Sequence, residues 1–157
     1  MTTEERITVA ADTFTAAIAA APYFADIPVS DERKGDINAT IANAVAKLGV
    51  CVTVVAADGD GLVRVGRNLR LRIRLVAQIT ELYLINQGPT GTHKPALSVA
   101  TAAMKAVDRQ PNGLDPAGAS HRDGLNEFLL AEAQPFRLVP DPRLIVYHVT
   151  AYTSVEL

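Results

Sequence analysis

The chain has 157 residues, of which 48% are hydrophobic and 20% are charged, and its formal net charge is -2. This length is typical of one domain that buries a core without metal or disulfide support. A slightly acidic chain lacks the basic face that phosphate contacts require, so the composition argues against a nucleic-acid-binding module. Cys51 is the only cysteine, which excludes an intrachain disulfide framework. Its apolar neighbours predict a small buried side chain.

The first twenty residues predict a helix that packs against a sheet. Thr2 and Glu5 have the spacing of a capping box, apolar side chains recur at helical spacing, and Pro22 ends the pattern. Glu4 and Glu5 stand where a secretory signal would carry positive charge, so no export signal is expected. The alanine-rich residues 9–21 are too short to span a bilayer, and no membrane association is expected.

The next segments predict a short edge strand, a helix and a buried strand. Residues 23–29 form a short apolar connection in which Pro28 permits only an edge strand. A second helix begins after Asp36, a suitable N-cap, and ends at Gly49. Residues 50–57 are almost continuously apolar and read as a strand buried on both faces.

Residues 69–85 predict an unusually long strand. Apolar residues alternate with polar ones from Leu69 to Ile79, and the opposite face begins with Arg70, Arg72 and Arg74. The turn-rich segment from Asp58 to Gly61 and the following residues connect this strand to the preceding one. The two strands therefore predict a long hairpin with an extended tip over residues 58–68.

A third helix over residues 96–107 follows a Gly/Pro/Thr loop, with Thr92 or His93 as its cap and Pro95 near its first turn. Residues 110–124 read as a long irregular loop and residues 125–131 as a short helix. Residues 136–139 and 144–155 predict the last strands. The expected fold is one α+β domain over residues 1–157, with a mostly antiparallel sheet, a long hairpin, and helices packed on one face.

Motifs that would carry chemistry fail on spacing. The loop from Gly88 to Lys94 lies between a strand and a helix, but Pro95 replaces the hydroxyl residue of a phosphate-binding loop. The tripeptide at residues 121–123 lacks every other part of a kinase signature, and residues 58–61 lack the later ligands of a calcium loop. No histidine has a second ligand at metal-binding spacing. We therefore expect no catalytic, cofactor-binding or metal site, and no enzymatic activity.

The arginine row, Arg70, Arg72 and Arg74, admits two interpretations. A solvated strand face would carry charges that discourage unwanted pairing. Alternatively, the row is a subunit or partner surface, because arginine pairs well with carboxylates across interfaces. The second interpretation predicts an interface that also includes the hairpin tip, comprising Asp58, Asp60, Arg64, Arg67, Arg70, Arg72 and Arg74.

The order of elements resembles the tail-terminator, or tail-completion, proteins of long-tailed bacteriophages and related particles. The resemblance lies in the N-terminal helix, the long hairpin, the helix after the Gly/Pro/Thr loop, and the closing stretch that reads LVPDPRLIVY at residues 138–147. It implies a non-catalytic subunit of a hexameric ring that caps the tail tube, stops tail polymerisation and joins tail to head. The implied partners are further copies of the chain, the tail tube protein, a neck or head-connector protein, and the sheath in a contractile tail.

This resemblance places the protein in the virion, after assembly in the host cytoplasm. Another neck or tail-tube subunit is an alternative of the same class. A small α+β ligand-binding domain or enzyme is an alternative of a different class, with its cleft between residues 88–94 and residues 121–123.

Overall fold

The computed structural model describes residues 1–114, 126–132, 134–139 and 141–157. In chain order the elements are α1 (Thr3–Ala20), η1 (Pro22–Phe24), β1 (Val29–Asp31), η2 (Glu32–Lys34), α2 (Ile37–Leu48), β2 (Val50–Val65), β3 (Asn68–Leu82), α3 (Tyr83–Asn86), α4 (Ala96–Val107), β4 (Leu129–Leu130), β5 (Phe136–Leu138) and β6 (Leu144–Glu156). Within these residues the sheet has six strands in the order β1-β2-β3-β6-β4, and β5 also pairs with β6.

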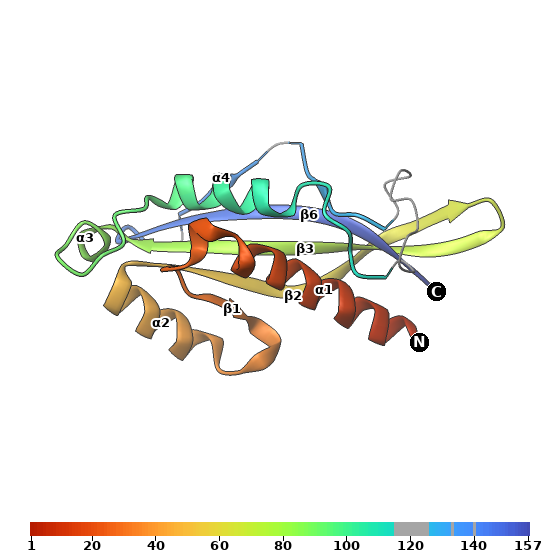
Figure 1. Ribbon diagram of the computed structural model, residues 1–157, viewed down its shortest axis with the longest axis horizontal. Helices are drawn as coiled ribbons and strands as arrows, with labels where there is room; N and C mark the ends of the chain where they lie inside the picture. The colour runs from red at the N-terminus through yellow and green to blue at the C-terminus, as the bar shows by residue number, and fades with distance from the viewer. Residues whose placement is uncertain (115–125, 133, 140) are drawn as a thin grey trace.

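The sheet is mostly antiparallel, and two helices cover one of its faces. Only β1 and β2 are parallel among these pairs, whereas β2, β3 and β6 form a long antiparallel ladder. Helices α1 and α4 lie side by side across these strands (Figure 1). Phe14 of α1 meets Phe128 edge to face, with ring centroids 5.3 Å apart, and both side chains are fully buried. The α+β class, the mostly antiparallel sheet and the long hairpin are confirmed.

Helix α2 is placed differently from the other two helices. Cys51, Thr80 and Val146 lie in register across β2, β3 and β6, on the face opposite the main core, and all three are buried. Val45 of α2 is also buried outside the main core, and α2 contacts β2 and β3. Helix α2 therefore covers the opposite face, whereas the sequence pattern predicted all helices on one face.

The hairpin turn is shorter and farther along the chain than predicted. Strand β2 runs through the acidic Gly-rich segment with bulges between Val55 and Asp58 and between Gly59 and Gly61. The turn itself is Gly66-Arg67, and Gly66 has φ 60°, which suits a two-residue hairpin. The glycines and aspartates of residues 58–61, which predicted a turn, therefore lie at bulges within strand β2.

Some of the predicted helix caps and short elements are confirmed, and others are wrong. The Thr2 capping box, the Asp36 N-cap and Gly49 at the end of α2 are confirmed. Pro95 is the N-cap residue of α4, one position before the helix. The short helix predicted at residues 125–131 is wrong over its described part, because Leu129–Leu130 pairs with β6 as β4. Most of the loop predicted at residues 110–124 lies outside the described residues.

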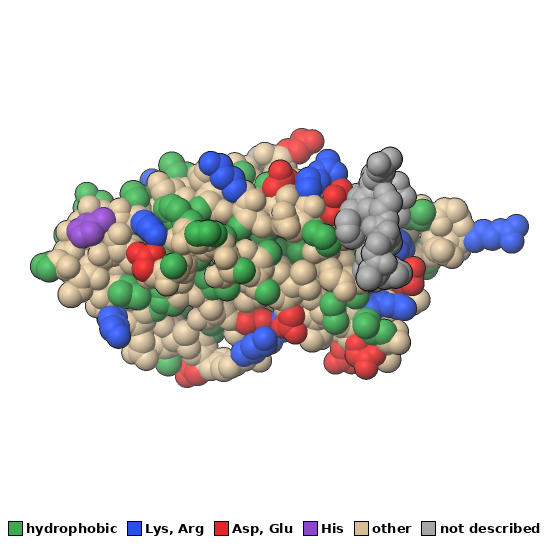
Figure 2. All heavy atoms as spheres, in the orientation of Figure 1, with side chains coloured by type: hydrophobic (Ala, Val, Ile, Leu, Met, Phe, Trp, Pro, Cys, Tyr) green, Lys and Arg blue, Asp and Glu red, His purple; other side chains and the backbone are tan. Residues whose placement is uncertain are grey.

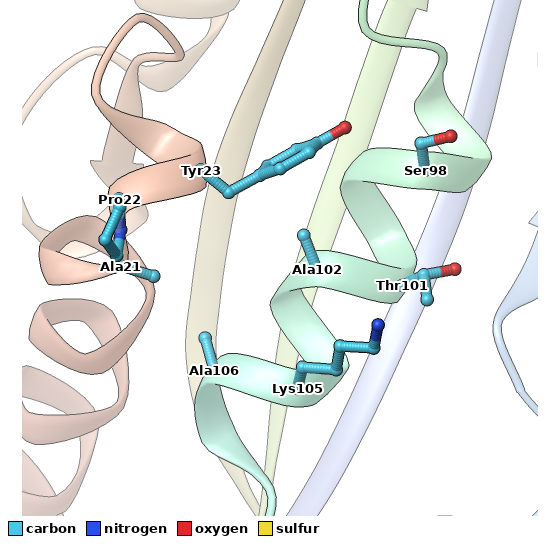
Figure 3. A pocket seen from close by; sticks show the side chains of 8 residues that line it. All are labelled: Ala21, Pro22, Tyr23, Ser98, Thr101, Ala102, Lys105 and Ala106. Atoms are coloured by element: carbon cyan, nitrogen blue, oxygen red, sulfur yellow. The ribbon is translucent and has the colours of Figure 1, made fainter.

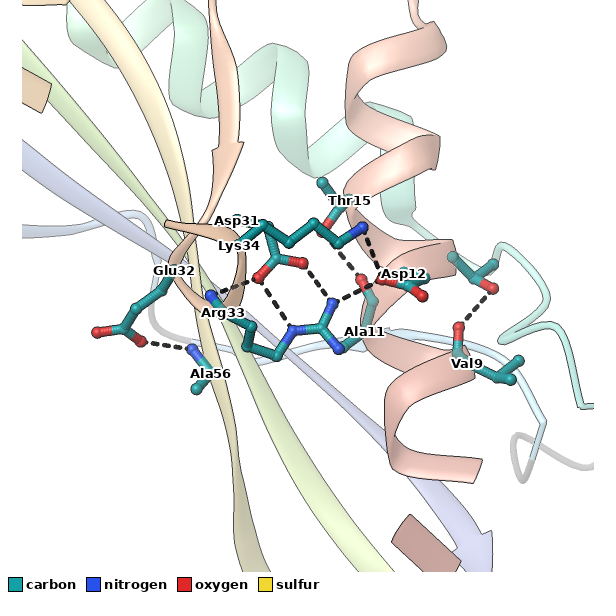
Figure 4. A network of polar contacts seen from close by, with 10 residues as sticks. Val9, Ala11, Asp12, Thr15, Asp31, Glu32, Arg33, Lys34 and Ala56 are labelled. Atoms are coloured by element: carbon teal, nitrogen blue, oxygen red, sulfur yellow. Dashed lines mark hydrogen bonds and ion pairs between the residues drawn. The ribbon is translucent and has the colours of Figure 1, made fainter. Parts of the chain in front are cut away.

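A polar network centred on the buried Asp31 attaches α1 to the edge of the sheet (Figure 4). The Arg33 guanidinium binds Asp31 at the end of β1 and, at 2.7 Å, Asp12 of α1. Burial alone would raise the pKa of the Asp31 carboxyl, but hydrogen bonds and charge from Arg33 outweigh it and lower the pKa. Lys34 adds a 3.2 Å contact to the same Asp12 oxygen that Arg33 contacts. The network fixes how the first helix enters the fold.

A second polar cluster holds the loop between α3 and α4. The fully buried Asn86 amide donates to Glu81 at 2.5 Å and to the Lys94 carbonyl at 3.0 Å. Thr92 donates to the Asn86 side-chain oxygen at 2.9 Å. Gly49 has φ 85° and packs so closely against Asn86 that a Cβ at position 49 would lie 2.2 Å from the Asn86 backbone nitrogen. The end of α2 and the loop before α4 are thereby fixed together.

Replacing Arg33 with Gln should change how stability depends on acid. In the wild type the lowered Asp31 pKa contributes stability above the unfolded-state pKa of about 3.9, and this contribution is lost as pH falls through the folded-state pKa. Without Arg33, burial dominates, so the variant should lose about 2–4 kcal/mol at pH 7 and regain part of it below about pH 5. Urea unfolding from pH 3 to 8 measures both, and Lys34→Gln is the control with a small expected effect. Parallel pH curves for the two variants would contradict this.

Replacing Gly49 with Ala should destabilise the protein strongly. The positive φ costs a side chain about 1–2 kcal/mol, and the overlap with the Asn86 backbone adds to it, so we expect a loss above about 3 kcal/mol. Gly66→Ala is the matched control, since that position also has a positive φ but open space around it. Equal unfolding midpoints for the two variants in urea would show that contact with Asn86 is unimportant.

Candidate assembly surface on the hairpin arm

The hairpin arm, which we define as residues 58–74, is the most exposed part of the long ladder. Strand β6 accompanies β3 as far as the pair Arg70 and Glu156, and the Leu157 amide then donates to the Leu69 carbonyl at 3.4 Å. Beyond that point only the two strands of the hairpin continue, and they form one end of the elongated molecule (Figure 1). The arm is thus a three-stranded stem with a two-stranded tip.

Two arginines of the arm are paired with aspartates of the neighbouring strand. Arg72 Nε donates to Asp60 at 2.7 Å, and Arg74 Nη2 donates to Asp58 at 2.6 Å. The Arg72 guanidinium also lies 4.9 Å from the ring centre of Tyr152 on β6. The bulges in β2 place both aspartates opposite this row. Half-exposed pairs of this kind contribute little individually, but together they connect three strands.

Arg70 corrects the prediction of one exposed arginine face. Its side chain is 8% exposed, donates to Ser154 Oγ at 2.9 Å and to Asn126 at 2.6 Å, and lies 3.5 Å from the Glu156 carboxylate. Asn126 belongs to the segment just before β4, which passes the end of β6 and helps to enclose the guanidinium. Arg70 therefore stabilises the subunit from within and is not available as an interface residue.

Arg64 and Arg67 at the tip differ from the arginine row. Both are exposed, and neither has a carboxylate partner within the described part of the chain. Of the seven residues predicted for an interface, these two keep an unpaired charge. Four of the other predicted residues, Asp58, Asp60, Arg72 and Arg74, lie near the surface but already form ion pairs with one another.

Apolar side chains surround the two free cations. Leu62 is 62% exposed and Leu69 is 36% exposed, while Leu62 pairs with Leu71, which packs against the main core. Cross-strand partners share a face of the sheet, so Leu62 continues the core face beyond its covering helices. Leu157 beside Leu69 is 54% exposed. This end of the molecule therefore combines uncovered leucines with unpaired arginines.

A groove lies on the opposite face of the sheet, at the base of the arm. It has a volume of about 320 Å³, and its lining includes Val55, Val76, Arg74 and His148. Burial, with a smaller contribution from the nearby Arg74 charge, lowers the His148 pKa, and its Nε2 lies 3.0 Å from Gln78 Oε1. These surroundings favour the neutral form of the imidazole, which is hydrogen-bonded to its neighbour on β3.

A larger groove of about 540 Å³ separates η1 from α4 (Figure 3). Its walls combine small apolar side chains with the hydroxyls of Ser98 and Thr101, and the Tyr23 ring lies on one side and Lys105 on the other. Lys94 lies outside this lining, 4.5 Å from the Tyr23 ring centre, and pairs with Asp26 at 2.6 Å. The groove has the surface of a docking hollow more than that of a reaction site.

The motifs considered for chemistry have structural explanations. The loop from Gly88 to Lys94 wraps around Asn86, and the Lys94 amine is engaged by Asp26 and the Tyr23 carbonyl. Burial raises the pKa of the Cys51 thiol to about 11, and this side chain is buried as predicted. The tripeptide at residues 121–123 lies outside the described residues. Residues 58–61 belong to β2.

No group of three or more His, Cys, Asp or Glu side chains that could hold a metal is found in residues 1–114 and the described segments after them. None of the helices formed by the described residues is both long and apolar enough to cross a membrane. A scan against protein-family models gives no match, and a search of curated proteins gives none either.

Replacing Arg70 with Ala should be far more destabilising than the same change at Arg72. The first substitution removes a buried guanidinium together with its hydrogen bonds to Ser154 and Asn126, so we expect a loss of about 2–4 kcal/mol. The second removes a half-exposed ion pair and a ring contact, for which about 1 kcal/mol is expected. Urea unfolding of both variants distinguishes these values. A larger loss for Arg72→Ala would mean that the buried contacts of Arg70 are unimportant.

Proposed function

We propose that this protein is a structural subunit of a phage tail or of a tail-derived particle. In this role several copies, six in the tail-terminator arrangement, form a ring that caps the tail tube, stops its polymerisation and offers a surface for joining to the head. The observation that carries the proposal is the hairpin arm, a three-stranded stem whose tip keeps exposed leucines and two unpaired arginines.

The stem has the features that an assembly arm needs. Its charges at Asp58, Asp60, Arg72 and Arg74 are satisfied within the subunit, so the arm can present a defined shape without a partner. A ring also covers strand edges and apolar patches that a free monomer leaves in water. The exposed tip is consistent with this arrangement because contact between copies would remove its leucines from water.

The partners in this proposal are further copies of the chain, the tail tube protein, a neck or head-connector protein, and the sheath where the tail is contractile. The protein then resides in the virion after assembly in the host cytoplasm, and it acts without catalysis. A neck or tail-tube subunit would use the same arm in a neighbouring ring of the particle.

The groove beside Tyr23 supports a second candidate, a small α+β ligand-binding domain. Its volume of about 540 Å³ is within the usual range for small-molecule sites, and Lys105, Ser98 and Thr101 supply polar groups at its wall. Its apolar lining equally suits a segment of another protein. A ligand-binding function would leave the exposed hairpin arm without a role. The ring subunit accounts for the arm and is therefore the stronger proposal.

The mass of the assembled protein tests the proposal directly. Size-exclusion chromatography with light scattering should give a multiple of the chain mass, six chains being the expected state, and negative-stain images should show rings. Purified tail tube protein added in a parallel sample should increase the assembled fraction. A protein that stays monomeric at every concentration, with and without tube protein, would rule out the ring.

A further inference from the structure

The two cations of the tip lie in a stretch of chain with no acidic residue. From Gly61 to Leu71 the sequence contains three arginines and neither Asp nor Glu. Arg70 is buried and hydrogen-bonded within the subunit. Arg64 and Arg67 therefore remain as a local positive charge beside exposed leucines. Figure 2 shows basic side chains at the extreme end of the molecule. A surface that is complementary in charge to this tip would supply carboxylates.

An unpaired carboxylate lies at the same end of the molecule, in the first turn of α1. Glu5 is engaged in the capping box, where its carboxylate accepts from the Thr2 amide at 2.6 Å. Glu4 is exposed and has no cationic partner in the described chain. Acidic side chains gather near this end of α1 in the space-filling view (Figure 2). The chain thus carries an unpaired charge of each sign at one end.

The first turn of α1 is held firmly beside the arm. Arg6 donates to the Glu156 carbonyl at 3.2 Å, and Thr3 donates to the same oxygen at 3.5 Å. Glu156 in turn pairs with Arg70 of β3. The relative positions of the acidic turn and the basic tip are therefore set by contacts within the subunit, and neither neutralises the other there.

We propose that copies of this chain associate through this end, with Arg64 and Arg67 of one copy against the Glu4 turn of another. Leu62, Leu69 and Leu157 are removed from water in the contact. A second copy is the matching occupant because each copy supplies both charge signs: the tip of one copy meets the Glu4 turn of the next, a heterologous contact of the kind that closes a ring. This inference rests on the proposed function and assigns its subunit contact. Exposed pairs contribute little affinity alone, whereas the leucines supply burial and the charges select the register.

Charge reversal with mixing tests the inference. Arg64→Glu together with Arg67→Glu should weaken self-assembly at least about tenfold, because like charges then face each other. Glu4→Lys should weaken it in the same direction. An equimolar mixture of the two variants should restore assembly, since each variant tip then meets an oppositely charged turn. Arg137→Glu is the matched control, because Arg137 is also exposed and without an ion pair in the described chain.

Circular dichroism and urea unfolding confirm that each variant is folded before light scattering measures its assembly. Assembly of the doubly reversed variant at the level of Arg137→Glu would overturn the inference and leave the ring proposal standing. Loss of assembly without restoration on mixing would overturn the assignment of the α1 turn as the counterpart. A monomeric wild type would instead refute the proposed function itself.

Discussion

The paired charges on the arm explain how a long hairpin can keep a defined shape away from the main core. Long two-stranded ribbons are marginal in water, because they bury little apolar surface. Here β6 adds a third strand, and Arg70, Arg72 and Arg74 each bond to a neighbouring strand or segment. The buried Arg70 contacts contribute most, since unmet partners there would cost more than a lost surface pair. Everything proposed for the tip depends on this stem.

The sequence pattern correctly predicted the features that depend on interactions between residues close together in the chain. The caps at Thr2 and Asp36, the end of α2 at Gly49 and the apolar alternation of β3 all depend on near neighbours. The burial of Arg70 could not be predicted, because Asn126 and Ser154 are 56 and 84 residues away in sequence. The bulges in β2 were read as a turn since glycine and aspartate favour both. The sequence pattern predicted α2 on the wrong face of the sheet, because the sequence does not reveal that β1 pairs in parallel with β2.

Within the predicted interface, the structure distinguishes charges that are already paired from charges that are free. Sequence alone treats Arg64 and Arg74 alike, but only the second has an aspartate within hydrogen-bonding distance. The signal that could have separated them is the spacing of Asp58 and Asp60 from the arginine row, which becomes interpretable only once the bulged register is known. The proposed ring and its copy number rest on the resemblance, and the free tip supports only the proposal that copies of the chain associate.

The central claim is that a rigid stem presents a tip that is completed by another copy of the chain. Amide hydrogen exchange of the wild type, in dilute and in assembled samples, tests both halves at once. The account predicts that β3 amides of the stem are protected in both samples, while amides of residues 62–69 gain protection only on assembly. Rapid exchange throughout the stem, or a tip that exchanges equally in the two samples, would contradict it.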